Sequence, residues 1–493
     1  MNVHCIEISI IMKLKYSIIN TIVFLALSGQ VVSAQVGKPF IHDPSTILQC
    51  DGKYYTFGTR GGGLVSEDGW RWDSGGIRPG GGAAPDMLKI GNRYLVVYGA
   101  TGGGLGGGHN GKILTMWNNT LDPKSPDFKY SEAVVVAASD GVEDNDAIDP
   151  GLLLDPTDGR LWLSYGTYFG FIRLIELDPT TGKRKAGNIA KDIAIDCEAT
   201  TMMYREGWYY LLGTHGTCCD GANSTYNIVV GRSKKVTGPY LDNMGRDMLK
   251  GGGKMVIAAG GRVNGPGHFG LFDFGDGVQK MSCHYEADLD QSGRSVLGIR
   301  PLLWENGWPV AGDLFKEGTY EIESERRGYA LELVVDFTRM PGGMRGFNYN
   351  NNEPVKSIPS QQLADVIQSW PKGNIGVRTG DYMFRPHQKW TITAVPEAGG
   401  YLGGPYFKIV IAGTERALAA TSAAELVTVP IFTGAAEQLW RIDQLIDGTY
   451  RIMPKTVPNS NKQLALVSSG DSSPTLAEFD MNSDNSKWNF RSH

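Results

Sequence analysis

Three carboxylates stand in short segments that resemble one another although they lie far apart in the chain. Asp43 occurs in His-Asp-Pro-Ser, Asp149 in Ala-Ile-Asp-Pro-Gly and Glu198 in Cys-Glu-Ala-Thr. Two carboxyl groups cleave a glycosidic bond when one stays protonated as general acid and the other, ionised, activates water. A third acid nearby raises the pKa of the general acid, because like charges resist joint ionisation. An Asp-Pro on its own is most often the start of an ordinary turn, but three such acids brought together predict acid–base chemistry.

The elements that must position these acids form a repeat. Asp86 and His268 open two further segments of the same kind, Ala-Pro-Asp-Met and Gly-Pro-Gly-His. Each segment precedes a glycine-bounded run of aromatic and branched residues, such as 52–58 and 207–213, which is typical of a strand. Five imperfect repeats over 36–315 predict a five-bladed β-propeller, whose inner strands line one channel. All five polar residues would then converge on one axis. A β-sandwich would explain the strands, but not the polar residue that opens each repeat.

Residues 316–493 follow a different, three-part pattern. Three hairpin-rich units close on Gln-Lys-Trp, Gln-Leu-Trp and Ser-Lys-Trp, which end at Trp390, Trp440 and Trp488. This predicts a three-fold β-trefoil with the three tryptophans in its core. The pattern resembles ricin-type lectin domains with their Q-x-W repeats, with Ser486 in place of the third Gln. Whether the trefoil binds sugar or braces the propeller is open at this point.

Composition agrees with an all-β chain, a five-bladed propeller followed by a trefoil. Gly accounts for 66 of 493 residues, about twice the usual ~7 %, and glycine supplies the positive φ that many tight turns need. The net charge of −5 gives no basic field for nucleic acid. Five cysteines follow residue 34, an odd and sparse set that does not describe a disulfide framework.

The N-terminus has the pattern of a signal peptide. Lys13 and Lys15 precede the apolar run 18–27, which leads to Val-Ser-Ala before Gln35. That run is shorter than the ~20 residues of a membrane-spanning helix; a buried core helix is the alternative interpretation. We expect an exported monomer (periplasmic, cell-surface or extracellular) without a membrane span. Its expected parts are a signal peptide (1–34), a catalytic propeller (35–315) and a carbohydrate-binding-like trefoil (316–493).

The motifs resemble glycoside hydrolase family 43, particularly its endo-1,5-α-L-arabinanase branch. Beside the three acidic segments, the most specific stretch is Cys-Cys-Asp-Gly-Ala-Asn-Ser-Thr-Tyr (218–226), which continues to Gly-Pro-Tyr (238–240). The resemblance implies an inverting mechanism. It also implies that Asp43 is the general base, that Glu198 is the general acid, and that Asp149 modulates the pKa of Glu198 and orients it.

The same resemblance implies a metal and a set of substrate contacts. Gly-Pro-Gly-His (265–268) is similar to the family's channel segment, whose histidine holds calcium or another cation through water. Because imidazole is a poor calcium ligand compared with oxygen, we expect a water-mediated contact from His268. The candidate substrate-binding residues, on segments near the blade strands, are His42, Asp86, His109, Tyr168, Phe169 and His215.

Some positions depart from the family pattern. Ala83 and Ala84 stand where an aromatic commonly forms a sugar-stacking wall, and glycine tracts (61–63, 80–82 and 102–108) crowd the expected rim. The primary prediction is hydrolysis of α-1,5-L-arabinan or arabino-oligosaccharides. The alternatives are an exo-acting arabinofuranosidase, xylosidase or galactanase on the same scaffold, or a carbohydrate-binding protein without catalysis.

Overall fold

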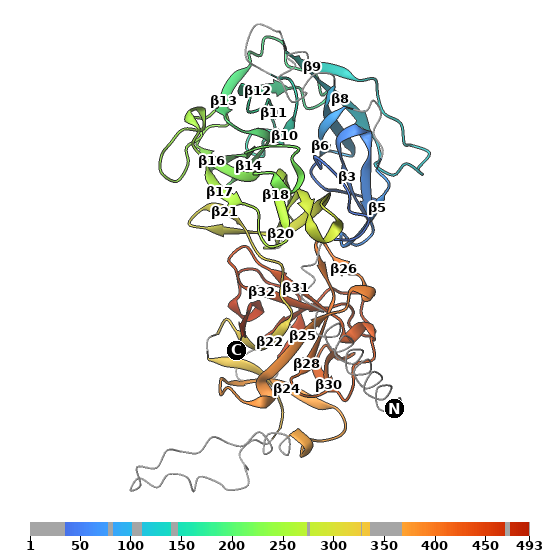
Figure 1. Cartoon of the computed structure of the whole chain (residues 1–493). Helices are drawn as coiled ribbons and strands as arrows, with labels where there is room; N and C mark the ends of the chain where they lie inside the picture. The colour runs from blue at the N-terminus through green and yellow to red at the C-terminus, as the bar shows by residue number, and fades with distance from the viewer. Residues whose placement is uncertain are drawn as a thin grey trace, which may run out of the picture. The chain divides into compact units, whose positions relative to one another are not determined.

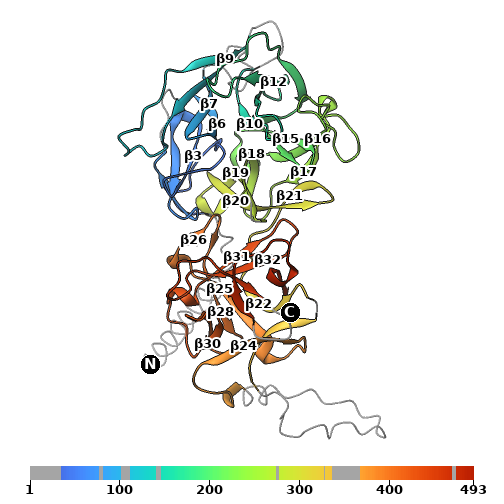
Figure 2. The same cartoon turned by 180° about the vertical axis from the view of Figure 1, so that it is seen from behind.

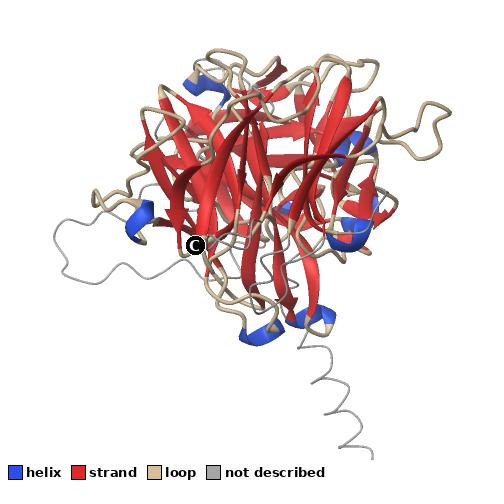
Figure 3. Cartoon of the chain, turned by 90° about the horizontal axis from the view of Figure 1, so that it is seen from above, coloured by secondary structure: helices blue, strands red, loops and turns tan. Residues whose placement is uncertain are grey.

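The structure is a computed structural model that describes residues 35–76, 82–100, 111–139, 146–273, 277–326, 328–335, 367–468 and 474–492. These residues form strands joined by tight turns and short 3₁₀ helices (Figure 3). The predicted signal peptide and His109 lie outside the described residues, as does the glycine tract 102–108. Among the described helices, none has the length and apolar character needed to cross a membrane.

Five antiparallel sheets built from consecutive strands form the blades of the propeller (Figures 1 and 2). The first strands of neighbouring blades contact one another in turn, so they form the inner wall. The first blade contains β2 (Leu48–Cys50), β3 (Lys53–Phe57), β4 (Gly63–Ser66) and β5 (Arg71–Ser74), with β1 (Val36–Gly37) parallel to β5, and the second contains β6 (Ala83–Ile90), β7 (Arg93–Ala100), β8 (Lys112–Asn118) and β9 (Val134–Ala138). The third blade contains β10 (Gly151–Leu154), β11 (Leu161–Tyr165), β12 (Phe171–Leu177) and β13 (Lys191–Ile195), and the fourth contains β14 (Glu198–Arg205), β15 (Trp208–His215), β16 (Asn227–Ser233) and β17 (Lys254–Ile257). The fifth blade contains β18 (Val263–Asp273), β19 (Gln279–Asp288), β20 (Arg294–Glu305) and β21 (Trp308–Ala311).

One backbone position recurs in all five blades, at or just before the inner strand. Asp43, Ala84, Asp149, Ala199 and His268 have φ values of 52°, 48°, 51°, 48° and 57°. Such positive φ is uncommon for residues other than glycine. The register shifts beside this position in the second, fourth and fifth blades, as at a β-bulge. The structure therefore corrects the predicted repeat: the residues equivalent to Asp43 in the second and fourth blades are alanines, and the two acids there are offset from it.

The C-terminal part is the predicted trefoil. It contains β22 (Gly318–Ser324), β23 (Tyr329–Leu333), β24 (Ile375–Asp381), β25 (Lys389–Ala394), β26 (Gly400–Tyr401), β27 (Gly404–Pro405), β28 (Phe407–Ile411), β29 (Ala417–Ala420), β30 (Leu426–Val429), β31 (Trp440–Gln444), β32 (Tyr450–Pro454), β33 (Ala465–Val467), β34 (Thr475–Ala477) and β35 (Trp488–Ser492). The short 3₁₀ helices of the whole chain are η1 (Thr59–Gly61), η2 (Gly221–Asn223), η3 (Met248–Lys250), η4 (Leu289–Gln291), η5 (Pro386–Gln388), η6 (Pro396–Ala398), η7 (Ala436–Gln438) and η8 (Asp484–Ser486).

The three closing tryptophans lie in equivalent places, as predicted. Trp390, Trp440 and Trp488 are fully buried in one apolar core. Each follows a 3₁₀ helix at or near the start of a strand, and each donates its indole N–H to a leucine carbonyl at 2.9–3.0 Å. Burial of a large aromatic side chain with its one polar atom satisfied stabilises a core strongly. The tryptophans are thus structural residues.

Candidate active site

The inner strands and their loops enclose a cavity of about 530 Å³. Six of the predicted site residues line it: the three acids, His42, Tyr168 and Phe169. They come from the first, third and fourth blades. The fold thus brings Asp43 together with Asp149 and Glu198, each of which lies more than a hundred residues further along the chain.

Asp43 is held in its ionised form by the groups around it. Its Oδ2 lies 2.8 Å from Nδ1 of His42 and accepts a 2.5 Å hydrogen bond from the hydroxyl of Thr59, while its Oδ1 lies 3.2 Å from Nδ1 of His268. Burial alone would raise the pKa of Asp43, but His268 and His42 hold the pKa well below its ordinary value. An ionised carboxylate with such neighbours is suited to the role of general base.

A second carboxylate, that of Glu286, interacts with His42 through the ring nitrogen that does not face Asp43. Glu286 on β19 is buried, and its Oε1 lies 3.1 Å from Nε2 of His42 and 3.3 Å from Nε2 of His284. The backbone N–H of Asp43 donates to Nδ1 of His284, so His284 carries its proton on Nε2, facing Glu286. His42 instead has a carboxylate at each ring nitrogen; although burial opposes protonation, Asp43 and Glu286 raise the pKa of His42 to about 10.

Glu198 has the opposite electrostatic environment. It is buried at the start of β14, and burial, followed by the charges of Asp149 and Asp43, raises its pKa well above the ordinary value. The hydroxyl of Tyr226 donates a hydrogen bond to Oε1 of Glu198. A carboxyl group that keeps its proton beside an ionised carboxylate is the arrangement that general acid catalysis needs.

Asp149 lies between these two extremes. Its pKa is raised to about 7: burial is the main cause, the charge of His268 opposes the shift, and the charge of Asp43 adds to it. Its charge is in turn one of the causes of the raised pKa of Glu198. The predicted role of Asp149 in modulating the general acid agrees with this electrostatic coupling.

Two of the predicted substrate contacts, Asp86 and His215, do not line this cavity. Asp86 accepts hydrogen bonds from the backbone N–H groups of Thr46 (3.1 Å) and Leu152 (2.9 Å), so its buried carboxylate joins the first three blades. This geometry favours a structural role for Asp86. His215 is half-buried, lies 3.4 Å from Asp196 and is not among the residues that line the cavity. His109 lies outside the described residues.

The apolar wall of the cavity is formed by a pair of aromatic rings. The rings of Tyr168 and Phe169 lie 4.6 Å apart, and Phe169 remains 42 % exposed. Ala83, where the resemblance predicted an aromatic residue, lines the same cavity. Sugars pack their C–H faces on aromatic rings, so a position on the cavity wall suits Tyr168 and Phe169 to sugar stacking, and they stay predicted substrate contacts.

The predicted calcium contact at His268 has a donor set that would need water. Around His268 lie Oδ1 of Asp43, 3.2 Å from its Nδ1, the hydroxyl of Thr214, which accepts its backbone N–H, and the ring of His284, with 6.1 Å between the ring centroids. Calcium takes 6–8 oxygen ligands, so a cation here would draw most of its ligands from solvent. Calcium at His268 therefore stays a prediction, in the water-mediated form.

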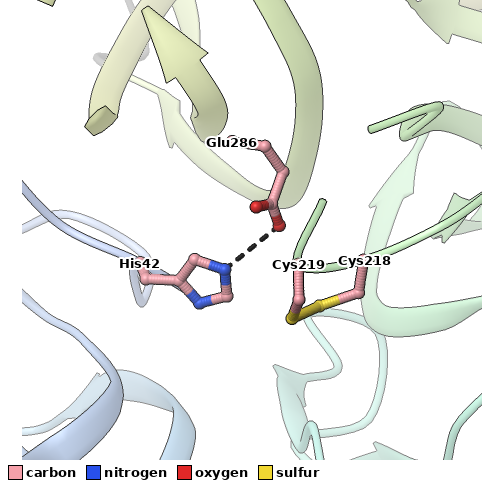
Figure 4. A group of neighbouring side chains, drawn as sticks. All are labelled: His42, Cys218, Cys219 and Glu286. Carbon is pink, nitrogen blue, oxygen red and sulfur yellow. Dashed lines mark hydrogen bonds and ion pairs between the residues drawn. A yellow bond between two sulfur atoms is a disulfide. The ribbon is translucent and has the colours of Figure 1, made fainter. Parts of the chain in front are cut away.

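The structure adds residues that the sequence pattern did not indicate. Thr59, Tyr226 and Glu286 contact the predicted acids or His42. Cys218 and Cys219 form a disulfide between neighbouring residues, which lines the cavity beside His42 and Glu286 (Figure 4). The odd cysteine count had favoured no disulfide framework; the structure has this one bridge, and the other three described cysteines are free and buried.

Comparison with known proteins decides the family. The model for "Glycosyl hydrolases family 43" matches residues 61–309, half of the chain. The chain belongs to glycoside hydrolase family 43. It is therefore a glycoside hydrolase, and the predicted five-bladed propeller is the fold that carries its site. A second model, "Ricin-type beta-trefoil lectin domain-like", matches residues 386–478 and confirms the trefoil.

The similar proteins of known activity are named for action on arabinan. This family-43 chain is 32 % identical over 231 residues to the extracellular endo-α-(1→5)-L-arabinanase 1 of Bacillus subtilis (strain 168), covering 46 % of this chain and 67 % of the relative. It is also 32 % identical over 244 residues to the extracellular exo-α-(1→5)-L-arabinofuranosidase ArbA of Cellvibrio japonicus (strain Ueda107), covering 46 % and 68 %. Among solved structures, an exo-1,5-α-L-arabinanase from a bovine ruminal metagenomic library matches with TM-score 0.50 and 33 % identity, over 56 % of this chain and 97 % of that one.

Proposed function

We propose that this family-43 enzyme is exported and hydrolyses α-1,5-linked L-arabinan or arabino-oligosaccharides with inversion at the anomeric carbon. The observation that carries the mechanism is the difference between two carboxyl groups that line one cavity: Asp43 is held ionised and Glu198 is held protonated. The substrate and the export follow from the relatives, which are named as extracellular arabinan-degrading enzymes.

In this mechanism the ionised Asp43 removes a proton from the water that attacks the anomeric carbon. Thr59 and His42 hold its Oδ2 by a hydrogen bond and an ion pair, which fixes the direction of the remaining lone pairs. Glu198 gives its proton to the leaving oxygen, and Asp149 keeps that proton on Glu198 until the bond breaks. The hydroxyl of Tyr226 orients the Glu198 carboxyl group. Inversion requires ~6.5–9.5 Å between the two carboxyl groups, so that water fits between them.

The decisive experiment follows the products rather than the rate alone. Purified enzyme is given linear arabinan, short arabino-oligosaccharides, xylan and β-1,3-galactan, and the products are separated by size. Proton NMR during the first minutes reports the anomeric configuration of the new reducing end. We expect hydrolysis of the arabinan substrates with the inverted anomer formed first. Retention of configuration, or turnover confined to xylan or galactan, would overturn the proposal.

Exo action on the same substrate is a second candidate, because one of the similar enzymes is named as an exo-arabinofuranosidase and one similar structure as an exo-arabinanase. The same product analysis separates the two modes. Internal cleavage releases a ladder of oligomers early, whereas exo cleavage releases one short product throughout. Asp43→Asn serves as the inactive control in both cases, since it keeps the shape of the side chain and removes the base.

A further inference from the structure

The Cys218–Cys219 disulfide, His42 and Glu286 form a cluster at the cavity wall that the mechanism above uses only in part. The three groups come from different parts of the propeller: the segment before β2, the segment between β15 and β16, and β19. Figure 4 shows the His42 ring facing both the Glu286 carboxylate and the sulfur of Cys219. The four possible ligand atoms, one nitrogen, two sulfurs and one oxygen, all lie within 4.8 Å of one another.

Once the bond between the two sulfurs is broken, four groups this close together can reach one small tetrahedral cation. Zinc binds sulfur at about 2.3 Å and imidazole nitrogen at about 2.0–2.1 Å, which puts neighbouring ligand atoms roughly 3.3–3.8 Å apart. Nε2 of His42 and Oε1 of Glu286, at 3.1 Å, are already close to that separation. Two cysteines, one histidine and one carboxylate are ligands that Zn²⁺ prefers, and they differ from the oxygen set that calcium prefers.

The oxidation state of the cysteines decides whether this ligand set exists. A thiolate is the sulfur ligand of metals, and the sulfurs of a disulfide carry no such charge. Reduction adds two electrons and two protons to the S–S bond and gives two thiols; an external dithiol supplies both and becomes a disulfide itself. Cys219 is exposed, so a dithiol can reach the bond. A divalent cation would then displace the two thiol protons and the proton between His42 and Glu286, all three passing to solvent.

We propose that reduction of Cys218–Cys219 creates a binding site for a thiophilic divalent cation, Zn²⁺ or Cd²⁺, formed by the two thiolates, His42 and Glu286. A cation bound there takes Nε2 of His42, the nitrogen that faces Glu286, and leaves Nδ1 of the same ring paired with Asp43 at 2.8 Å. It also places positive charge at the wall of the cavity that the three acids line. The bound cation therefore stops hydrolysis. This inhibition rests on the function proposed above, whereas the binding itself does not.

The experiment measures binding and hydrolysis separately on the full-length protein. Oxidised protein and protein reduced with dithiothreitol, then freed of excess reductant without air, are titrated with CdCl₂ while the ultraviolet thiolate-to-Cd²⁺ charge-transfer band is followed. Equilibrium dialysis with ZnCl₂ gives the number of ions bound. We expect one ion per reduced chain, none at the same concentrations in the oxidised chain, and none in reduced protein alkylated with iodoacetamide.

Three variants assign the ligands. Cys218→Ser combined with Cys219→Ser should abolish the band, and Glu286→Gln should weaken binding by about tenfold or more. Cys50→Ala is the matched control, because Cys50 is another described thiol beside a carboxylate, with its Sγ 3.4 Å from Oδ2 of Asp51. The band should survive in that variant. Equal binding by the oxidised and reduced chains, or a band that persists in the double variant, would overturn the site.

Hydrolysis of arabinan by the reduced protein should be lost with one equivalent of Zn²⁺ and return when a chelator is added, while the oxidised protein is unaffected. A chain that binds Cd²⁺ after reduction but hydrolyses no arabinan in any state contradicts the proposed function and leaves the metal site standing. A chain that hydrolyses arabinan but binds no Cd²⁺ after reduction contradicts the metal site and leaves the function standing.

Discussion

The trefoil and the propeller both consist of repeats, but they use repetition differently. In the trefoil the same residue performs the same task three times: Trp390, Trp440 and Trp488 are all fully buried, and each indole N–H reaches a leucine carbonyl. In the propeller the same backbone conformation recurs five times while the side chain changes. Asp43 and His268 occupy that position in two of the blades.

The difference separates residues that hold the fold from residues suited to chemistry. Where a repeat keeps both backbone and side chain, each copy contributes to stability in the same way. Where it keeps the backbone and varies the side chain, the fold supplies a ring of equivalent places. Different groups on that ring can then meet at short distance, as Asp43 and His268 do at 3.2 Å. Positive φ at such residues costs on the order of 1–3 kcal/mol each, which the rest of the blade must offset.

The largest expected effect tests the propeller side of this comparison. Glu198→Gln removes the proton donor and keeps the size of the side chain, so kcat on arabinan should fall by about 10²–10⁴-fold. The melting temperature should not fall, because the variant removes a buried carboxyl group whose pKa is raised by burial and by the charges of Asp149 and Asp43. Calorimetry and initial-rate assays check the two expectations. A lower melting temperature with normal kcat would place Glu198 among the structural residues.

Trp440→Ala tests the trefoil side. Removal of a fully buried tryptophan, with loss of its hydrogen bond to Leu418, should lower the free energy of unfolding by about 3–5 kcal/mol. Chemical denaturation followed by circular dichroism measures this change. Phe384→Ala is the matched control in the same trefoil: its ring is 54 % exposed, and its loss should change stability by about 0.5 kcal/mol or less. Equal losses in the two variants would contradict the repeated-core interpretation.

The pH dependence of kcat/KM distinguishes two aspartates of the inner wall. Activity requires ionised Asp43 and protonated Glu198, so it should be lost as pH falls through the lowered pKa of Asp43 and as pH rises through the raised pKa of Glu198. Asp149→Asn removes a negative charge that favours protonated Glu198. The alkaline limb should therefore move to lower pH, in addition to a lower kcat.

The control for that shift is Asp86→Asn. Its carboxylate accepts two backbone hydrogen bonds, and it does not line the cavity of the three acids. This variant should lose about 1–3 kcal/mol of stability and keep the wild-type alkaline limb. An alkaline limb that moves in Asp86→Asn and stays in place in Asp149→Asn would exchange the roles assigned to the two residues.

The sequence was sufficient to find the acids because each stands just before or at the start of an inner strand, where a polar residue precedes an apolar run. Asp86 and Glu198 are not aligned with Asp43 as the repeat predicted, because a β-bulge shifts the register in their blades and the hydrophobic pattern does not reveal it. His284 and Glu286 escaped notice although they are two apart on β19 and so share one face of the strand. That spacing is the signal that could have found them. The Cys218–Cys219 disulfide was not predicted, because a count of cysteines does not show which of them are bonded to each other.

The smallest expected effect concerns Ser486, which replaces the glutamine of the third Q-x-W repeat in the trefoil. In the first two trefoil units the side-chain oxygen of the Q-x-W glutamine accepts a hydrogen bond from the backbone N–H five residues earlier, Gln388 from Met383 at 2.9 Å and Gln438 from Thr433 at 2.7 Å. Ser486, which occupies the third position, is buried and too short for that reach. Ser486→Gln would bring an equivalent acceptor toward the N–H of Met481, and one further hydrogen bond should add about 0.5–1.5 kcal/mol to the free energy of unfolding.

Thermal unfolding of Ser486→Gln beside Ser486→Ala measures this gain, with the alanine variant reporting the loss of the serine alone. If the third unit has the geometry of the first two, the glutamine variant melts higher than wild type and the alanine variant does not. A glutamine variant that melts lower shows that the site lacks the volume for a longer side chain, since overpacking typically costs about 1–3 kcal/mol. In that case the third trefoil unit differs from the first two in packing as well as in sequence, and the three units are equivalent only at their tryptophans.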